Sequence, residues 1–326
     1  MMTYLMDNVS LKGLVYKDGR LQRLNEEDRL KMTKETQDML LMPAGNEIRF
    51  YMEKDTVEIT LSSSQAMAVV YLGDFQESIH RVEGTYKIQI NMPKYLDDLQ
   101  DYDSSFHPRL VRIMLFGGIF NIEGISGSVR KPKHGEQPDK TLLFYGTSIT
   151  HGKYALDPSL TYPKLTGRFL KQDVINLGLA GTALIEPEMA ETIARLDYDS
   201  LVLCLSVNMF NLGYDEDEFF RRSKYLLDQV RIQKPHVDIY CISIIKSYYD
   251  HGIIKDNAWP VTSVEAYRRT LKTLAHQYDN VHYIDGTDLL STSGLSSDLL
   301  HPGNMGMIEI AQNLSKIIGE KDENQN

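Results

Sequence analysis

The chain has 326 residues, which is enough for two domains or for one large domain. Its 45 acidic and 35 basic side chains give a formal charge of −10 and a pI of about 5.4, which argues against a nucleic-acid partner because phosphate backbones attract basic surfaces. Residues 1–13 contain Asp7 and Lys12 and lack a basic stretch followed by an apolar run, and no later segment has the length and apolarity of a membrane span, so we expect a cytoplasmic protein with no membrane partner.

The first part of the chain has the pattern of a β-rich domain. Short alternating or β-branched runs separated by turn residues predict strands at residues 48–52, 56–61, 66–72, 85–90, 110–116 and 120–125. Closely spaced strands of this kind are typical of an antiparallel β-sandwich. Residues 130–139 then form a polar segment with two prolines and no apolar periodicity, so we place a domain boundary between residues 135 and 136.

The second part alternates between apolar strands and amphipathic helices. We predict strands at residues 141–145, 173–177, 200–205, 237–245 and 281–284, and helices at residues 162–170, 187–195, 216–233, 264–277 and 305–318. This alternation predicts a parallel five-stranded sheet covered by helices on both faces. The expected fold class is therefore α/β: a three-layer αβα domain at residues 136–326, preceded by a β-sandwich accessory domain at residues 1–135. Ligands of such sheets bind beyond the carboxyl ends of the strands.

Two short segments carry the side chains of a nucleophilic site. Ser148 lies in Gly-Thr-Ser-Ile-Thr directly after the first parallel strand, and Asp298 and His301 lie three residues apart near the C-terminus. A serine hydroxyl becomes a nucleophile at neutral pH when an imidazole accepts its proton, and a carboxylate can orient that imidazole. Each residue also has an ordinary alternative role: Ser148 as a helix cap, Asp298 as a loop cap, and His301 as part of a turn.

Two further segments follow neighbouring strands and offer donors for an oxyanion. Gly181 ends the segment Asn-Leu-Gly-Leu-Ala-Gly after the second parallel strand, where a glycine lets the backbone approach a ligand and present its N–H. Asn208 follows the third parallel strand and can donate through its side-chain amide. The alternatives are a turn glycine, and an asparagine that bonds its own loop.

In this order, the four segments resemble the conserved blocks of the SGNH, or GDSL-type, serine hydrolase superfamily. The resemblance implies that Ser148 is the nucleophile and the first oxyanion donor. It further implies that Gly181 and Asn208 are the second and third oxyanion donors, and that Asp298 and His301 complete a catalytic triad.

The resemblance covers about residues 140–320 and implies a flavodoxin-like fold there. The sequence departs from the family pattern at Thr147, where the family has Asp, and at Ser206 and Met209, which replace Gly and Asp around the asparagine. These changes put the shape and polarity of the acyl pocket in question. The segment Gly-Thr-Ser-Ile-Thr-His-Gly, together with the β-rich N-terminal part, is similar to a subgroup with a jelly-roll-like sandwich before the hydrolase domain. That subgroup includes an acyltransferase of polyketide biosynthesis.

Other side chains lie at the same expected edge of the sheet. Met209, Phe210 and Trp259 either line the substrate pocket or pack on the domain beneath it. We expect His151, on the first turn after the nucleophile, to lie on a helix surface.

The cysteines and histidines indicate neither a metal nor a cofactor. Cys204 and Cys241 each lie in an apolar strand, so we expect reduced, buried thiols, and a disulfide would require the two strands to be neighbours. The histidines lack metal-ligand spacing, and no Gly-Lys-Ser/Thr follows Gly146 or Gly152 to form a phosphate loop.

The sequence predicts a serine esterase, or acylhydrolase, that cleaves short acyl esters such as acetyl esters of a sugar or small alcohol. Acyl transfer to an acceptor other than water would use the same residues. The alternative from another class is a catalytically silent carbohydrate-binding or interaction protein on the same fold. The N-terminal domain either binds carbohydrate or shapes the mouth of the cleft, and we favour the second role. The sequence does not indicate an oligomeric state.

Overall fold

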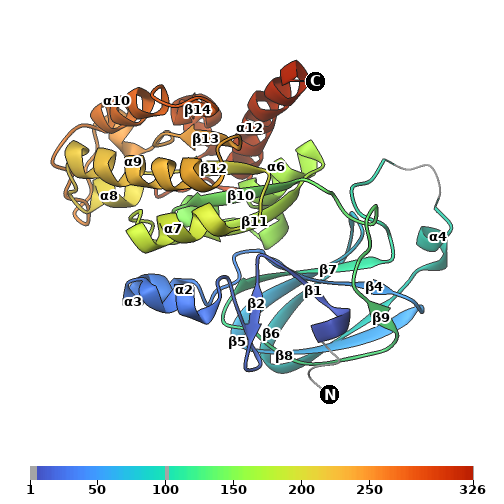
Figure 1. Cartoon of the computed structure of the whole chain (residues 1–326). Helices are drawn as coiled ribbons and strands as arrows, with labels where there is room; N and C mark the ends of the chain where they lie inside the picture. Colours follow the sequence, from blue (N-terminus) through green and yellow to red (C-terminus); the bar gives the residue numbers. More distant parts are fainter. Residues whose placement is uncertain (1–5, 100–102, 326) are drawn as a thin grey trace.

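The computed structural model describes residues 6–99 and 103–325. Two sheets organise the chain, an antiparallel sheet in the N-terminal part and a parallel sheet in the C-terminal part, and Figure 1 shows them as two stacked halves. Within the described residues, no helix has both the length and the apolar character that crossing a membrane requires.

The antiparallel sheet has nine strands in the order β1-β4-β7-β5-β8-β3-β2, with β6 beside β5 and β9 beside β4. Their bounds are β1 (Ser10–Lys12), β2 (Val15–Lys17), β3 (Arg20–Gln22), β4 (Glu47–Met52), β5 (Thr56–Leu72), β6 (Phe75–Asn91), β7 (Leu110–Gly117), β8 (Asn121–Ser126) and β9 (Val129–Arg130). The short helix α4 (Lys94–Asp97) lies between β6 and β7.

Strand β5 belongs to both layers of this domain. Its first half pairs with β8, its second half pairs with β7, and its register with β6 shifts between Ser63 and Ala66. Side chains from both halves, such as Ile59 and Val70, enter the same buried core, so the sheet folds over on itself as a sandwich. Our prediction of two strands at residues 56–61 and 66–72 is wrong, because the polar run at residues 62–65 interrupts the apolar alternation while the backbone pairing continues.

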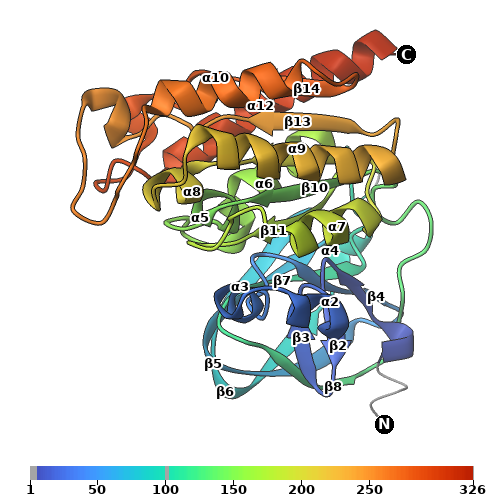
Figure 2. The ribbon, with the colours of Figure 1, turned by 60° about the vertical axis from the view of Figure 1, so that its left-hand side comes forward.

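The parallel sheet has the order β11-β10-β12-β13-β14. Its strands are β10 (Thr141–Gly146), β11 (Asp173–Gly178), β12 (Ser200–Cys204), β13 (Asp238–Ile242) and β14 (Val281–Ile284). The helices are α5 (Ser148–His151), α6 (Tyr162–Leu170), α7 (Pro187–Arg195), α8 (Val207–Asn211), α9 (Glu216–Gln233), α10 (Val264–Ala275), α11 (Gly286–Leu289) and α12 (Asn304–Gln325), with short 3₁₀ turns η1 (Pro158–Leu160), η2 (Tyr248–His251) and η3 (Thr292–Gly294). Helix α6 packs against α12 on one face, and α9 contacts α7 and α10 on the other (Figures 1 and 2). The predicted three-layer α/β fold is confirmed.

Two helices that the sequence analysis did not predict, α2 (Glu26–Lys31) and α3 (Lys34–Met39), join the N-terminal part to the parallel-sheet domain. Leu24, Met32 and Leu40 are buried in the main core of that domain, although they precede the sandwich strands β4 to β8 in the sequence. The hydroxyl of Thr33 also donates to Glu186, with an Oγ1–Oε1 distance of 2.9 Å. The first 135 residues therefore include, besides the sandwich, two helices that pack against the parallel-sheet domain.

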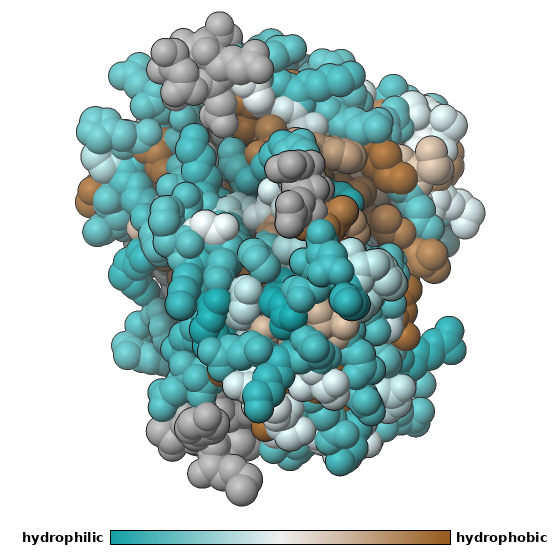
Figure 3. Space-filling model, turned by 90° about the vertical axis from the view of Figure 1, so that its right-hand side faces the viewer, coloured by the Kyte–Doolittle hydropathy of each residue, from teal (hydrophilic) through white to brown (hydrophobic). Residues whose placement is uncertain are grey.

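The chain passes from one sheet to the other between β9, which ends at Arg130, and β10, which begins at Thr141. The boundary that we predicted between residues 135 and 136 falls within this connection. Figure 3 views the side of the molecule that carries the connection, where hydrophilic residues cover most of the surface and hydrophobic residues gather towards one edge of the view.

The two cysteines are free and buried. Cys204 and Cys241 do lie on neighbouring strands, but the register pairs Cys204 with Ile242 and Leu203 with Cys241, so the two thiols point to opposite faces of the sheet. Burial raises the pKa of Cys204 to about 11 and that of Cys241 to about 12. The neighbouring strands thus do not permit a disulfide.

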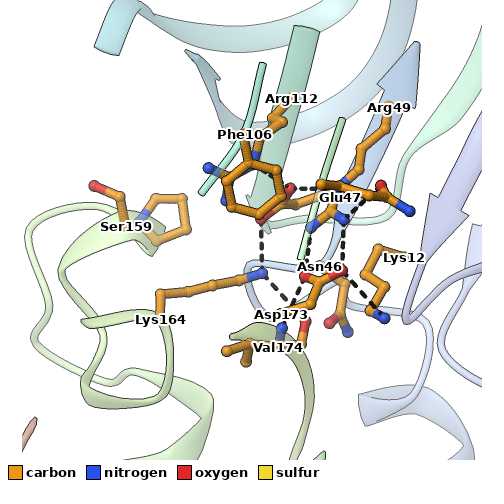
Figure 4. Close-up of polar contacts among 12 residues, drawn as sticks. Lys12, Asn46, Glu47, Arg49, Phe106, Arg112, Ser159, Lys164, Asp173 and Val174 are labelled. Carbon is orange, nitrogen blue, oxygen red and sulfur yellow. Dashed lines mark hydrogen bonds and ion pairs between the residues drawn. The ribbon is translucent and has the colours of Figure 1, made fainter. Parts of the chain in front are cut away.

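A cluster of buried charges joins the two domains (Figure 4). Glu47 of β4 accepts hydrogen bonds from Arg49, Arg112 and Lys164, and Arg49 also donates from both Nη atoms to Asp173 of β11 at 2.6 and 2.7 Å. Burial opposes ionisation of the two carboxyl groups, but the adjacent cations outweigh it. They hold the pKa of Glu47 well below its usual range and lower that of Asp173 to about 2.

Candidate active site

The turn after β10 places Ser148 at the first position of helix α5. Gly146 leaves room for this turn, because a Cβ there would lie 2.3 Å from the Thr150 hydroxyl oxygen. Thr147 is the N-cap, and its hydroxyl accepts from the backbone N–H of Ile149. Capping is therefore done by Thr147, which leaves the Ser148 hydroxyl free of that role.

The fold brings Ser148, His301 and Asp298 into one hydrogen-bonded series. Ser148 Oγ lies 2.7 Å from His301 Nε2, and His301 Nδ1 lies 2.6 Å from Asp298 Oδ2. Because the carboxylate can only accept, Nδ1 carries the proton in this series and Nε2 is left to accept from the serine hydroxyl. Ser148 is 8% exposed and His301 is 6% exposed, so bulk water has little access to the bond between them.

The loop of Asp298 fixes the carboxylate and keeps it charged. Asp298 Oδ1 accepts from the backbone N–H groups of Leu300 and His301 and from the Ser296 hydroxyl, at 2.8 to 2.9 Å. Leu299 takes a left-handed φ of 54°, which tightens the turn between the acid and the histidine. Burial favours the neutral acid, but these hydrogen bonds outweigh it and hold the pKa of Asp298 well below its usual range.

The environment of His301 favours a neutral ring. Burial lowers the pKa of His301, the ionised Asp298 acts in the opposite direction, and the cations Lys153 and Lys255 lower it further. The ring of Tyr154 packs edge-on against the imidazole with a centroid distance of 5.6 Å. A neutral imidazole beside a serine hydroxyl is the arrangement that general-base catalysis requires.

Gly181 and Asn208 follow the two strands that flank β10, Gly181 on the loop after β11 and Asn208 in helix α8 after β12. Strands β11 and β12 border β10, and the sheet register sets Gly178 and Cys204 level with Gly146. Gly181 follows three residues after β11 with φ of 79°, and no other atom lies within 4 Å of where its Cβ would be. The buried Oδ1 of Asn208 has no hydrogen-bond partner among the described residues, so this oxygen is not held by a bond to its own loop.

Gly178 and His151 pack the end of β11 against helix α5. A Cβ on Gly178 would lie 2.2 Å from the backbone nitrogen of His151, so this glycine serves close packing and does not face open space as Gly181 does. His151 is buried, its Nδ1 lies 3.1 Å from the Gly178 carbonyl oxygen, and its ring packs on Phe116 of β7. Our prediction of a surface histidine is wrong, because the N-terminal domain covers this side of α5.

Sequence reasoning missed the residues of the N-terminal domain that hold this region. Asn46 and Asn176 exchange two hydrogen bonds of 2.9 Å through the Asn46 side chain and the Asn176 backbone. Asn176 Nδ2 in turn donates to the carbonyl of Thr150 in α5. Arg23 donates to the carbonyl of Gly178. No sequence motif marks these contacts, since Asn46 lies 130 positions from Asn176 and Arg23 lies 155 positions from Gly178.

The three predicted lining residues have different surroundings. Met209 and Phe210 are fully buried in the main core, and Phe210 packs between Tyr249 and Tyr267, which corresponds to the alternative that they support the domain beneath. Trp259 is 62% exposed on the loop after β13.

A cavity of about 220 Å³ lies elsewhere, between the domains. Its walls include Tyr71, Phe106 and Arg112 from the N-terminal part, and Leu160 and Lys164 from the parallel-sheet domain. It adjoins the charge cluster of Figure 4, and none of the residues of the Ser148 site lines it.

Comparison with known proteins gives a family match and a set of similar structures. The sequence pattern of the GDSL-like Lipase/Acylhydrolase family matches residues 139–319. No curated protein matches the chain.

Several solved structures share the fold over nearly the whole chain. A salicylyl-acyltransferase, SsfX3, from a tetracycline biosynthetic pathway has 18% identity and a TM-score of 0.73, over 97% of this chain and 95% of that one. A GDSL-like lipase from Bacteroides ovatus ATCC 8483 has 17% identity and a TM-score of 0.71, over 96% and 98%. A family two carbohydrate esterase from Clostridium thermocellum, in complex with cellohexaose, has 14% identity and a TM-score of 0.65, over 96% and 98%. At these identities the likeness shows a shared fold, with a β domain before the parallel-sheet domain.

Proposed function

The chain belongs to the GDSL-like lipase/acylhydrolase family, and we propose that it is a serine esterase in which Ser148 is the nucleophile, His301 the general base and acid, and Asp298 the residue that orients His301. The observation that carries this proposal is the hydrogen-bonded series from Ser148 Oγ through the His301 ring to the Asp298 carboxylate. The proposed steps use side chains and backbone N–H groups of this chain, together with water.

The reaction has two steps in this proposal. Ser148 Oγ attacks the ester carbonyl while His301 Nε2 takes its proton, and the same proton then passes to the leaving alcohol as the carbon–oxygen bond breaks. Water next attacks the acyl-serine, gives its proton to His301, and Ser148 recovers that proton as the acid leaves. Asp298 stays ionised throughout and stabilises the imidazolium, which its depressed pKa supports.

We assign the oxyanion to three donors: the backbone N–H groups of Ser148 and Gly181, and the side-chain amide of Asn208. The positions of Gly181 after β11 and of Asn208 in α8 after β12, on the two strands beside that of the nucleophile, support this assignment, as does the open space at Gly181. Donors held in place before the reaction stabilise the charge that develops on the carbonyl oxygen.

Short acyl esters, such as acetyl esters of a small alcohol or a sugar, are the proposed substrates. The structurally similar carbohydrate esterase supports this class by analogy of fold. The structurally similar salicylyl-acyltransferase supports the alternative that an alcohol, and not water, receives the acyl group. Both alternatives use the same acyl-serine.

The test is hydrolysis of p-nitrophenyl acetate by the native protein and by Ser148→Ala. We expect the variant to lose activity by several orders of magnitude while its circular dichroism and melting temperature stay unchanged. Ser64→Ala, an exposed serine on β5, is the matched control and should keep full activity. Full activity in Ser148→Ala would refute the assignment. Product analysis with added alcohols separates transfer from hydrolysis.

A further inference from the structure

Most exposed apolar side chains of the parallel-sheet domain lie at the edge of the sheet that carries Ser148. In the described part of residues 139–325, ten large apolar side chains are exposed, and eight of these lie on the segments that follow the carboxyl ends of the strands. The eight are Tyr154, Leu156, Leu212, Ile253, Ile254, Trp259, Val261 and Met305. Single exposed apolar residues need no explanation, but a gathered set of them at one edge indicates a binding surface.

The first group, Tyr154, Leu156 and Met305, lies on the His301 side and is here called the histidine wall. Tyr154 packs on the His301 ring and takes a left-handed φ of 69°, a conformation that is rare for a bulky residue and is found at functional sites. The Leu156 N–H donates to Asn304 Oδ1 at 2.8 Å, and Asn304 begins α12 three residues after His301. The side chains of Leu156 and Met305 are 69% and 71% exposed, so both are open to solvent.

The second group lies on the loop at residues 247–262 and beside it, and is here called the loop wall. It consists of Leu212, Ile253, Ile254, Trp259 and Val261. This loop is tied to the acid loop, because the Tyr248 N–H donates to the Leu299 carbonyl at 2.7 Å and Lys255 Nζ donates to the carbonyl of Asp298. The loop therefore begins next to the residue that orients His301.

The far end of the same loop is tied to the helix that carries Asn208. The Trp259 N–H donates to the carbonyl of Asn211, the last residue of α8, at 2.8 Å. Gly213 lets the loop pack closely, since a Cβ there would lie 2.7 Å from the Trp259 carbonyl oxygen and 3.7 Å from Val261 Cγ1. Leu212, Trp259 and Val261 thus form one apolar surface beside the proposed oxyanion donor.

We propose that the histidine wall and the loop wall bind the hydrophobic body of the substrate, so that the preferred substrates are small esters of an aromatic or aliphatic alcohol and not of a hydroxyl-rich sugar. The inference rests on the proposed function and narrows its substrate class. His301 must deliver a proton to the leaving alcohol, which places that alcohol on the side of His301 and against Tyr154, Leu156 and Met305.

The side chains of the two walls favour binding of an aromatic or aliphatic alcohol over binding of a sugar. Of the eight exposed side chains, only Tyr154 and Trp259 carry a hydrogen-bonding group, whereas a sugar needs many such partners. The two cations at the site are already engaged, Lys153 over the Tyr154 ring at 5.5 Å and Lys255 with the Asp298 carbonyl. Water on the walls is released when an apolar alcohol covers them, which favours binding.

Trp259 is the single tryptophan of the chain, so its fluorescence reports on the loop wall directly. Ser148→Ala protein titrated with phenyl acetate should show a saturable shift of tryptophan emission, at an ester concentration at least tenfold lower than with a monoacetylated glucose. Equal or tighter binding of the sugar ester would overturn the proposal. So would an emission shift that appears only with phosphatidylcholine vesicles, or only with rising protein concentration, since those results assign the walls to a membrane or to a second copy of the chain.

Kinetics of the native protein give the second readout. Leu156→Ser and Met305→Ser should each raise KM for phenyl acetate about tenfold more than KM for methyl acetate, because the larger alcohol makes more contact with the histidine wall. Ile232→Ser is the matched control: Ile232 is as exposed as Leu156 but lies on α9. Unchanged KM in both wall variants overturns the inference. Failure of the native protein to cleave any ester counts against the proposed function alone, since the Trp259 titration reports binding without turnover.

Discussion

Arg23, which lies between β3 and α2, donates a hydrogen bond from Nη1 to the carbonyl oxygen of Gly178 at the end of β11, with an N–O distance of 2.6 Å. The second Nη donates to the carbonyl of Met39 at 2.6 Å, and among the described residues no carboxylate acts on the pKa of the guanidinium. Arg23 is 3% exposed, and burial lowers its pKa to about 9. A buried cation thus fixes the carbonyl three residues before Gly181.

We predict that Arg23→Met lowers kcat for a short ester by roughly 10-fold to 100-fold with little change in KM, because the loop of Gly181 then loses its anchor and small displacements of catalytic groups are costly. Arg23→Lys keeps a cation and should recover part of kcat. Steady-state kinetics beside thermal unfolding tests this. A variant that loses stability but keeps the native kcat would show that Arg23 supports the fold alone.

Gly181→Ala should reduce kcat by about 10²-fold to 10³-fold, the usual effect of losing one oxyanion donor. The new methyl group has open space but forces a left-handed conformation that moves the N–H. Gly135→Ala is the control, because Gly135 has a similar φ of 82° and equally open space in the connection between the sheets. Both variants should lose the same stability in urea unfolding, and only the first should lose activity. Equal kinetics in the two would remove Gly181 from the site.

The pH dependence of kcat/KM should follow the ionisation of His301. The neutral ring is the active form, and its pKa lies below the ordinary 6.5, so activity should hold below pH 6.5 and fall only as the pH passes through the lowered pKa. Asp298→Asn removes the carboxylate that raises this pKa, so the acid limb should move to lower pH while the plateau drops about 10⁴-fold. A pH profile with a non-titrating ester measures both. An acid limb above pH 6.5 contradicts this account.

Glu47→Gln should destabilise the protein by about 3 to 5 kcal/mol, because it leaves the buried cations Arg49, Arg112 and Lys164 without their shared carboxylate. Glu58→Gln is the matched control on the surface, where the pair with Lys87 is solvated and its loss should change the free energy of unfolding by less than about 1 kcal/mol. Urea unfolding followed by circular dichroism compares the two. Similar losses in both variants would mean that the charge cluster contributes little.

The same cluster should make the fold sensitive to acid. The folded pKa values of Glu47 and Asp173 lie below the ordinary 4.5 and 3.8, so their contribution to stability is complete above those ordinary values. It is lost as the pH falls through the folded values. The native protein should therefore lose more stability between pH 5 and pH 3 than the Glu47→Gln variant does. An identical pH dependence in the two proteins would contradict the role of Glu47.

The architecture could be predicted where the sequence pattern is long and regular. Helices α6, α7 and α9 have the predicted bounds, because each buries one periodic face against the sheet. Helices α2 and α3 have six residues each, which is too short for a period to be visible. Strand β13 is shorter than predicted, since Ser243, Ile244 and Ile245 are buried but form no ladder.

The residues of the candidate site could be predicted from the sequence, but the contacts that hold them in place could not. Ser148, Asp298 and His301 each sit in a short local motif, and the structure joins them by hydrogen bonds. Their support depends on contacts such as that of Arg23 with Gly178, at a separation of 155 positions that no local pattern encodes. The burial of His151 was mispredicted for the same reason.

The buried charge cluster also sets an order of events during synthesis. Arg49 leaves the ribosome 124 residues before its partner Asp173, which corresponds to roughly 6 to 25 seconds of translation. Glu47 finds Arg49 and Arg112 within its own domain during that interval, while the Nη atoms of Arg49 remain hydrated. Until the parallel sheet docks, the sandwich therefore lacks the carboxylate that pairs with the Nη atoms of Arg49.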